Sequence, residues 1–149
     1  MTAVTSQEYA MNIEMFAAET LPAASQAFSI HADQVLLEGG TNPDYGTVKW
    51  RTLIDGSPCT PKEFILGLAE MGPHGTLPAH RHEPAEFYLG LDGDGIVTIE
   101  GVPHQIKAGV AIYLPANAEH GVLAGPDGLR FAYGFAEGNY QAIQYNFSK

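Results

Sequence analysis

From Gly39 onward the chain consists of short runs rich in β-branched and aromatic residues, and this pattern is its strongest constraint on the fold. The runs read YGTVKWRTLI, EFILGLAEM, EFYLGL, GIVTIEGV, GVAIYL, GVLA and RFAYGF. Turn-forming segments separate them, namely DGS, MGPHG, DGDG, EGVP and AGPDG. Strands at this spacing predict an antiparallel sandwich or barrel, and 149 residues are enough for one such domain with its own core.

The first part of the chain has a different pattern. Apolar residues recur at steps of three and four within residues 6–19, a stretch without glycine or proline, which predicts one amphipathic helix. A second helical turn is expected around residues 23–28. The predicted organisation is therefore a helical extension over residues 1–35 and a β-domain over residues 36–149.

The amino-acid composition restricts the classes of molecule that the protein is expected to bind. The net charge of −10 repels the phosphates of nucleic acids and anionic membrane surfaces, so a small molecule is the expected partner. Cys59 is the single cysteine and cannot form an internal disulfide, which fits a reducing compartment. The N-terminus lacks the features of a signal peptide, and no window approaches eighteen apolar residues. We expect a soluble cytoplasmic protein with no nucleic-acid or membrane partner.

The nonapeptide HRHEPAEFY, which begins at His80, concentrates ligand-type side chains. Alternate residues of an extended strand point to the same face, so His80 is expected to point with His82, and Glu86 with Tyr88. Pro84 is expected to bend the segment between the two pairs. Two imidazoles and a carboxylate arranged in this way can converge on one metal ion.

A second segment, GVAIYLPANAEH, supplies a fourth candidate ligand. Gly109 is expected to close a turn, residues 111–114 to form a strand, and Pro115 to end it. His120 follows on the next loop or strand. In an antiparallel barrel, His120 would face the first cluster.

These two segments resemble the two conserved motifs of the cupin superfamily. The first motif is HxHxxxE followed by a glycine seven residues after the glutamate, and it is matched here by His80, His82, Glu86 and Gly93. The glycine that opens the motif is displaced, because Gly75 lies one residue nearer the first histidine than is usual.

The second motif is glycine, five residues, proline, one residue, glycine, two residues and histidine. Gly109, Pro115 and His120 match it, but Asn117 stands where glycine is usual. Asparagine tolerates positive φ better than other residues with a side chain, so we expect the turn to be kept. Ala124 replaces an asparagine that the family often carries, with little consequence for metal binding.

The resemblance implies an all-β, jelly-roll-like cupin barrel with the helical extension at its N-terminus. It also implies that His80, His82, Glu86 and His120 bind one divalent transition metal at the mouth of the barrel. Fe(II) is favoured, but the ligand set by itself does not choose among Fe, Mn, Ni, Co and Zn.

Aromatic residues are the other candidates for the site. Tyr88 is expected to point into the metal cavity, as a catalytic base or acid whose pKa falls beside the cation, or simply as lining. Trp50 and Tyr133 are expected to line the barrel and are candidates for substrate binding. Tyr140, a candidate second catalytic tyrosine, and Tyr145, a candidate substrate contact, would form a lid or cap the barrel.

The other arginines and histidines are weaker candidates for binding a substrate or a metal. Arg51 and Arg130 are arginines on predicted strands, and each either holds a substrate carboxylate or lies at the surface. His31, His74 and His104 have no partner pattern that would make them ligands.

Cupins host several reactions, so the resemblance implies the site more firmly than the chemistry. A non-oxidative lyase is favoured, because the HxHxxxExY run and the small size resemble dimethylsulfoniopropionate (DMSP) lyases, which release dimethyl sulfide and acrylate. The alternatives are an Fe(II)-dependent dioxygenase, a sugar isomerase or epimerase, and a non-catalytic metal-binding cupin. Similar cupins often form homodimers through barrel edges, with an acidic monomer as the alternative.

Overall fold

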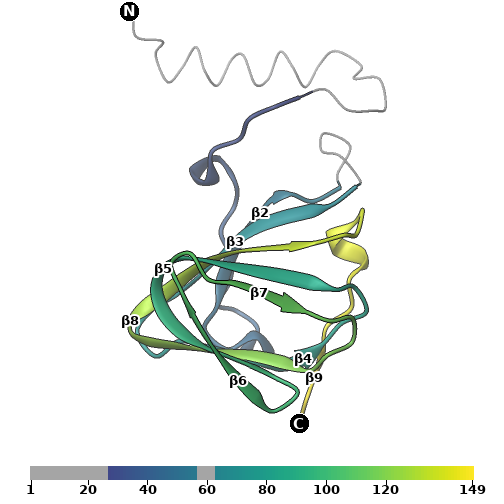
Figure 1. Ribbon diagram of the computed structural model, residues 1–149. Helices are drawn as coiled ribbons and strands as arrows, with labels where there is room; N and C mark the ends of the chain where they lie inside the picture. Colours follow the sequence, from purple (N-terminus) through teal and green to yellow (C-terminus); the bar gives the residue numbers. More distant parts are fainter. Residues whose placement is uncertain (1–26, 57–62) are drawn as a thin grey trace, which may run out of the picture.

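The computed structural model describes residues 27–56 and 63–149, which form a nine-stranded sheet with three 3₁₀ turns (Figure 1). The strands are β1 (Glu38–Gly39), β2 (Lys49–Ile54), β3 (Ile65–Met71), β4 (Thr76–Arg81), β5 (Glu86–Ile99), β6 (Val102–Lys107), β7 (Ala111–Leu114), β8 (His120–Phe135) and β9 (Asn146–Phe147). The 3₁₀ turns are η1 (Ala32–Gln34), η2 (Pro43–Tyr45) and η3 (Tyr140–Ala142).

The helix predicted over residues 6–19 lies outside the described residues. Of the second predicted helical turn, only residues 27 and 28 are described, and they belong to irregular chain. None of the helical segments in the described ranges has the length and apolar character needed to cross a membrane.

Two long strands organise the sheet. β8 pairs with β3, β4 and β5, while β5 also pairs with β6 and β7, and all of these pairings are antiparallel. β5 and β8 bend, and the sheet curls back on itself (Figure 1). The all-β class predicted from the turn-separated runs is confirmed.

Two of the predicted turns are wrong, because β5 continues through DGDG and β8 continues through AGPDG. Gly93 and Gly128 have φ of 67° and 81°, and a Cβ at Gly93 would lie 2.1 Å from the carbonyl oxygen of Gly128. Glycine at these positions lets each strand bulge and bend without ending, and the pairing shifts register between Gly93 and Gly95. The bends therefore wrap the sheet instead of dividing it.

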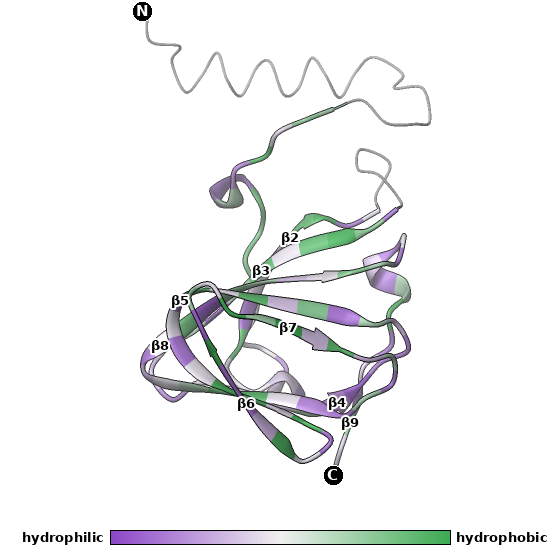
Figure 2. Cartoon of the chain, viewed as in Figure 1, coloured by the Kyte–Doolittle hydropathy of each residue, from purple (hydrophilic) through white to green (hydrophobic). Residues whose placement is uncertain are grey.

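Hydrophobic and hydrophilic residues alternate along the strands (Figure 2). Along β3, buried residues alternate with more exposed ones, as expected for a strand with one face on a core. The core between the curled parts of the sheet includes Ile65, Val97, Ile106, Leu114 and Phe131, each at most 1% exposed. This packing positions the strand ends that carry the candidate ligands.

Candidate metal centre

Three histidines and one glutamate meet where β4, β5 and β8 come together. His80 on β4 is the register partner of His120, the first residue of β8. His82 directly follows the end of β4, and Glu86 is the first residue of β5. All four side chains are buried, with exposed fractions of 1–5%.

Their polar atoms face one another. Ligand nitrogens of the three histidines all lie within 4.8 Å of one another, so they could hold one metal ion. The Oε2 atom of Glu86 lies 3.0 Å from Nε2 of His82 and 3.3 Å from Nε2 of His120. The structure thus brings together the four side chains that the two motifs single out.

Backbone carbonyls orient the three imidazole rings. Nδ1 of His80, His82 and His120 each lies 2.9 Å from a carbonyl oxygen, of Pro78, Pro84 and Ala118 respectively. A carbonyl oxygen only accepts hydrogen bonds, so each Nδ1 carries the proton and donates it. In the neutral tautomer, every Nε2 then presents a lone pair to the centre of the cluster.

This arrangement fits a cation. Lone pairs on neutral imidazoles and a carboxylate repel one another unless a proton or a metal ion lies among them. Nε2 of His120 is buried and, within the described residues, has no hydrogen-bond partner. Three imidazole nitrogens and one carboxylate suit a divalent transition metal.

The ionisation of the cluster agrees with this fit. Burial, followed by the proximity of His120, lowers the pKa of His80 to about 4, so its imidazole is neutral at physiological pH. Burial alone would raise the pKa of Glu86, but contacts with His120 and His82 lower it below its usual value. A neutral His80 and an ionised Glu86 are the forms in which these side chains bind metals.

The loop before β8 carries the asparagine that replaces the motif glycine. Asn117 has φ of 60°, so asparagine does adopt the positive φ expected for this turn. Its backbone N–H donates to the carbonyl of His82 over 2.9 Å, and its own carbonyl accepts from Arg81 over 3.0 Å. The loop is thereby tied to the segment that carries the first two histidines.

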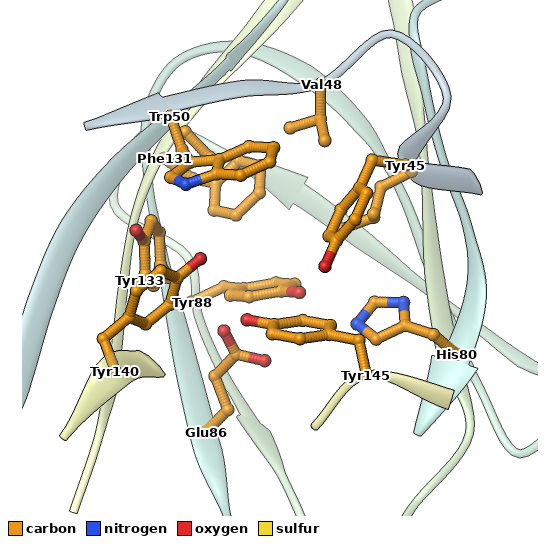
Figure 3. A pocket seen from close by; sticks show the side chains of 12 residues that line it. Tyr45, Val48, Trp50, His80, Glu86, Tyr88, Phe131, Tyr133, Tyr140 and Tyr145 are labelled. Atoms are coloured by element: carbon orange, nitrogen blue, oxygen red, sulfur yellow. The ribbon is translucent and has the colours of Figure 1, made fainter. Parts of the chain in front are cut away.

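A cavity lined mostly by aromatic side chains adjoins the cluster (Figure 3). It contains about 370 Å³ of empty space including its open mouth. His80 and Glu86 form its polar part, and Trp50 has an indole N–H that is buried without a hydrogen-bond partner in the described part of the chain. The remaining wall includes Tyr45, Tyr88, Phe131, Tyr133, Tyr140 and Tyr145.

Burial keeps Tyr88, Tyr133, Tyr140 and Tyr145 of this wall protonated at neutral pH. Burial, followed by the charge of Glu86, raises the pKa of Tyr88 well above its usual value. Burial also raises the pKa of Tyr133 and Tyr145 strongly, but that of Tyr140 only to about 12. The hydroxyl contacts of Tyr140 with Tyr145 and Tyr133 lower its pKa and offset part of the effect of burial.

An outer pocket lies beyond the cavity and shares its wall. Tyr45, Trp50, Tyr140 and Tyr145 line both spaces and therefore stand between them. The outer pocket is also lined by the acidic residues Glu38 and Asp55, by Thr52 and by Gln141. A molecule that reaches the cluster by this route passes the four shared aromatic residues.

Comparison with known proteins shows the family to which the chain belongs. The family model of the cupin domain matches residues 67–131. The dimethylsulfoniopropionate lyase DddW of Ruegeria pomeroyi is 60% identical to the chain over 120 residues, which are 80% of this chain and 79% of DddW. The chain is a cupin. Identity at this level over most of both chains also places this cupin in the same family as DddW.

Solved structures support the fold of this cupin. The polyketide cyclase RemF from Streptomyces resistomycificus has a TM-score of 0.69 and 24% identity, with 83% of this chain and 88% of RemF covered. A chain from the crystal structures of the DMSP lyases RdDddP and RnDddQII has a TM-score of 0.66 and 17% identity, with 77% of this chain and 63% of that chain covered. At these identities, the likeness concerns the fold alone.

Several polar candidates lie away from the cluster in this cupin. Arg51 donates to the backbone carbonyl of Val35, and Arg130 lines a separate pocket. His31 caps η1, while His74 and His104 are exposed.

Tyr45 is an aromatic residue of the cavity that the sequence did not single out. Its run was expected to be a strand, but Tyr45 ends the 3₁₀ turn η2, which Asn42 caps. The ring packs against Trp50 and Tyr145 at centroid distances of 5.2 and 5.7 Å. The segment NPDYG could have predicted this turn, because asparagine at a helical N-cap followed by proline favours a short helical turn.

Proposed function

We propose that this cupin is a metal-dependent DMSP lyase that splits its substrate into dimethyl sulfide and acrylate without oxidation. The identity of 60% with DddW carries the proposal. The site supports it, because a buried cluster able to hold a metal adjoins a cavity lined by several tyrosines. A β-elimination needs an acidified α-proton, a base and a bound leaving group, and the site offers a candidate for each.

For the metal, we propose Fe(II) held by His80, His82, Glu86 and His120. Mn, Ni, Co and Zn suit the same ligands. When bound, a divalent metal supplies Lewis acidity that draws electron density from the substrate carboxylate and makes the α-proton more acidic. Fixing each imidazole through its Nδ1–H keeps the Nε2 lone pairs directed to the centre of the cluster.

For the substrate, we propose that Trp50, Tyr133 and Tyr145 form its binding wall. A dimethylsulfonium group is a cation without hydrogen-bond donors, so aromatic faces suit it better than polar side chains. The rings of Tyr145 and His80 lie 5.2 Å apart between centroids. A small molecule that places its carboxylate at the ligand cluster would therefore place its dimethylsulfonium group among the aromatic rings.

For the chemistry, we propose tyrosine bases. Tyr88 or Tyr140 takes the α-proton, and the electron pair of the C–H bond becomes the double bond of acrylate. The bond between the β-carbon and sulfur then breaks, and its electron pair leaves on sulfur as neutral dimethyl sulfide. A buried phenol gives up its proton with difficulty, so the nearby cation is needed to favour the phenolate.

The test uses purified protein loaded with Fe(II) and supplied with DMSP, with and without oxygen. We expect equal rates of dimethyl sulfide release under both conditions, and turnover with several divalent metals. Oxygen consumption coupled to turnover would instead indicate the dioxygenase. A loaded protein that releases neither sulfide nor acrylate would refute the lyase proposal.

We also propose a homodimer that pairs through the outer face of β5 and β7. Phe87 and Tyr113 are register partners on this face with exposed fractions of 42% and 70%, and Leu89 and Leu91 continue it along β5. Analytical ultracentrifugation should show a dimer for the wild type and a monomer for Tyr113→Glu. A monomeric wild type would refute this assembly.

A further inference from the structure

Four charged residues form a row across four neighbouring strands. Lys49 on β2 is the register partner of Glu70 on β3. Glu70 is also the partner of Arg130 on β8, and Arg130 is the partner of Asp92 on β5. Directly opposed residues of antiparallel strands point to the same face, and all four of these residues are exposed. Their charges alternate in sign along this charge row.

The charges of the row are not paired within the protomer. None of the four side chains forms an ion pair with another residue of the described ranges. All four line one hollow of the surface, so they lie side by side. Exposed ion pairs within one protein contribute little to its stability. The charge row therefore remains available to charges on a partner.

The order of the charges makes the row complementary to itself. In a dimer with two-fold symmetry, a surface patch meets the same patch of the partner. An axis that runs along the strands, between β3 and β8, reverses the row of the partner. Lys49 then faces the partner's Asp92, and Glu70 faces the partner's Arg130. An axis along the row would instead put every charge opposite its own copy, so the row favours the first orientation and disfavours the second.

Apolar side chains adjoin the charge row on the same face. Leu68 lies two residues before Glu70 on β3, and alternate residues of a strand point to the same face. Leu68 is the partner of Ala132 on β8, and Ala132 is the partner of Leu89 on β5. Leu89 and Phe87 are 37% and 42% exposed. An apolar centre beside a charged rim is the usual composition of an interface between two proteins.

We propose that a second copy of the chain packs on the outer face of β2, β3, β8 and β5, with the two charge rows facing each other in reversed order. This inference rests on the homodimer proposed above and fixes its two-fold axis along the strands, between β3 and β8. It goes beyond the lyase function. Glu86 and Tyr88 alternate with Phe87 and Leu89 along β5, so the ligand cluster and the cavity lie on the opposite face.

The main test is charge reversal in the full-length protein, followed by analytical ultracentrifugation. Glu70→Arg and Arg130→Glu should each raise the dissociation constant of the dimer by about 10-fold or more, because each places like charges opposite one another at two positions. High salt should weaken the wild-type dimer, since it screens the charge row. Lys107→Glu is the matched control and should keep the wild-type constant, because Lys107 is exposed on β6, which pairs only with β5.

An equimolar mixture of Glu70→Arg and Arg130→Glu should form dimers again. In the mixed dimer, the reversed side chain of each variant faces the unchanged side chain of the other, so opposite charges meet at both positions. Pairing within one protomer cannot produce this recovery, because each variant keeps like charges side by side on its own sheet. A mixture that stays as dissociated as its components would overturn the proposal.

Cross-linking tests the direction of the axis. A carbodiimide joins a lysine amine to a carboxylate in direct contact, without a spacer. Within one protomer, Lys49 and Asp92 lie three strand spacings apart, about 14 Å at roughly 4.8 Å per spacing, which is too far for this bond. Mass spectrometry of a mixture of isotope-labelled and unlabelled wild type should therefore show a link from Lys49 to the partner's Asp92. Links from Lys49 to Glu70 of the same protomer alone would contradict the orientation.

The outcomes separate this inference from the other proposals. If the wild type is a dimer and neither charge reversal changes its dissociation constant, the role of the charge row is wrong and the homodimer through β5 and β7 stands. If the wild type is a monomer at every concentration, both assemblies are wrong. The release of dimethyl sulfide is measured separately and decides only the lyase.

Discussion

The ligand cluster and the tyrosine wall lie side by side but are held by different kinds of structure. His80, Glu86 and His120 lie on long paired strands, and a backbone carbonyl fixes each imidazole. In contrast, Tyr140 and Tyr145 belong to the C-terminal segment, which joins the sheet through the two-residue strand β9. The cluster is therefore preorganised by strand pairing, as are Tyr88 and Tyr133 of the wall, whereas the C-terminal part of the wall, Tyr140 and Tyr145, depends more on contacts between side chains.

Substitution of a residue in the ligand cluster should have the largest effect on bound metal and on turnover. His120→Ala removes one imidazole from a buried set, so bound metal and turnover should both be abolished. Changes to residues that only orient ligands cost about 10- to 100-fold in affinity, and removal of a ligand should exceed this range. Elemental analysis after dialysis measures the retained metal, with His104→Ala on the exposed face of β6 as the control. Undiminished metal in His120→Ala would refute the ligand set.

Tyr88, whose ring centroid lies 6.1 Å from that of His120, should affect turnover without affecting the bound metal. Tyr88→Phe removes a hydroxyl that interacts with Glu86 but leaves all four candidate ligands. If Tyr88 is the base, kcat should fall about 10²- to 10⁴-fold at unchanged metal content. Comparison with Tyr140→Phe under the same conditions identifies the base. A loss of metal in Tyr88→Phe would show that the cluster and the wall are not independent.

The aromatic wall should affect binding more than chemistry. Trp50→Leu removes an aromatic face that lines both the cavity and the outer pocket. Loss of one cation–π contact corresponds to about 0.5–2 kcal/mol, so KM should rise about 2- to 30-fold with a smaller change in kcat. Initial rates with DMSP, compared with an uncharged thioether of the same length as inhibitor, measure the charge dependence. An equal loss of affinity for both molecules would exclude recognition of the cation.

The smallest effect is expected from a substitution at the exposed ion pairs of Arg81, outside the ligand cluster. Arg81 pairs with Glu100 at 2.9 Å and with Glu119 at 3.4 Å, and the three side chains are 33–55% exposed. Exposed ion pairs contribute little because water screens them, so Arg81→Ala should lower the free energy of unfolding only slightly. Urea denaturation at low and high salt measures it. A much larger loss, or loss of metal, would mean that the loop at Asn117 depends on Arg81.

Much of the fold and of the ligand set could be predicted from the sequence, because both depend on short-range spacing. Residues 111–114 form a strand that ends before Pro115, and Asn117 takes the positive φ expected from its place in the motif. The turns expected at DGDG and AGPDG were wrong, because Gly93 and Gly128 bend strands whose pairing continues on both sides. Local turn signals do not distinguish a bulge from a turn when long-range pairing decides between them.

The sequence by itself determined which side chains can bind a metal and how they are spaced, since the direction of side chains along a strand follows from the chain alone. Only the tertiary structure decided that His80 pairs with His120, that Tyr45 joins the cavity, and that Tyr133 crosses Gly67 to reach Thr52. These contacts join strands and turns far apart in the sequence. They depend on strand register and close packing, and neither is written in the spacing of any one segment.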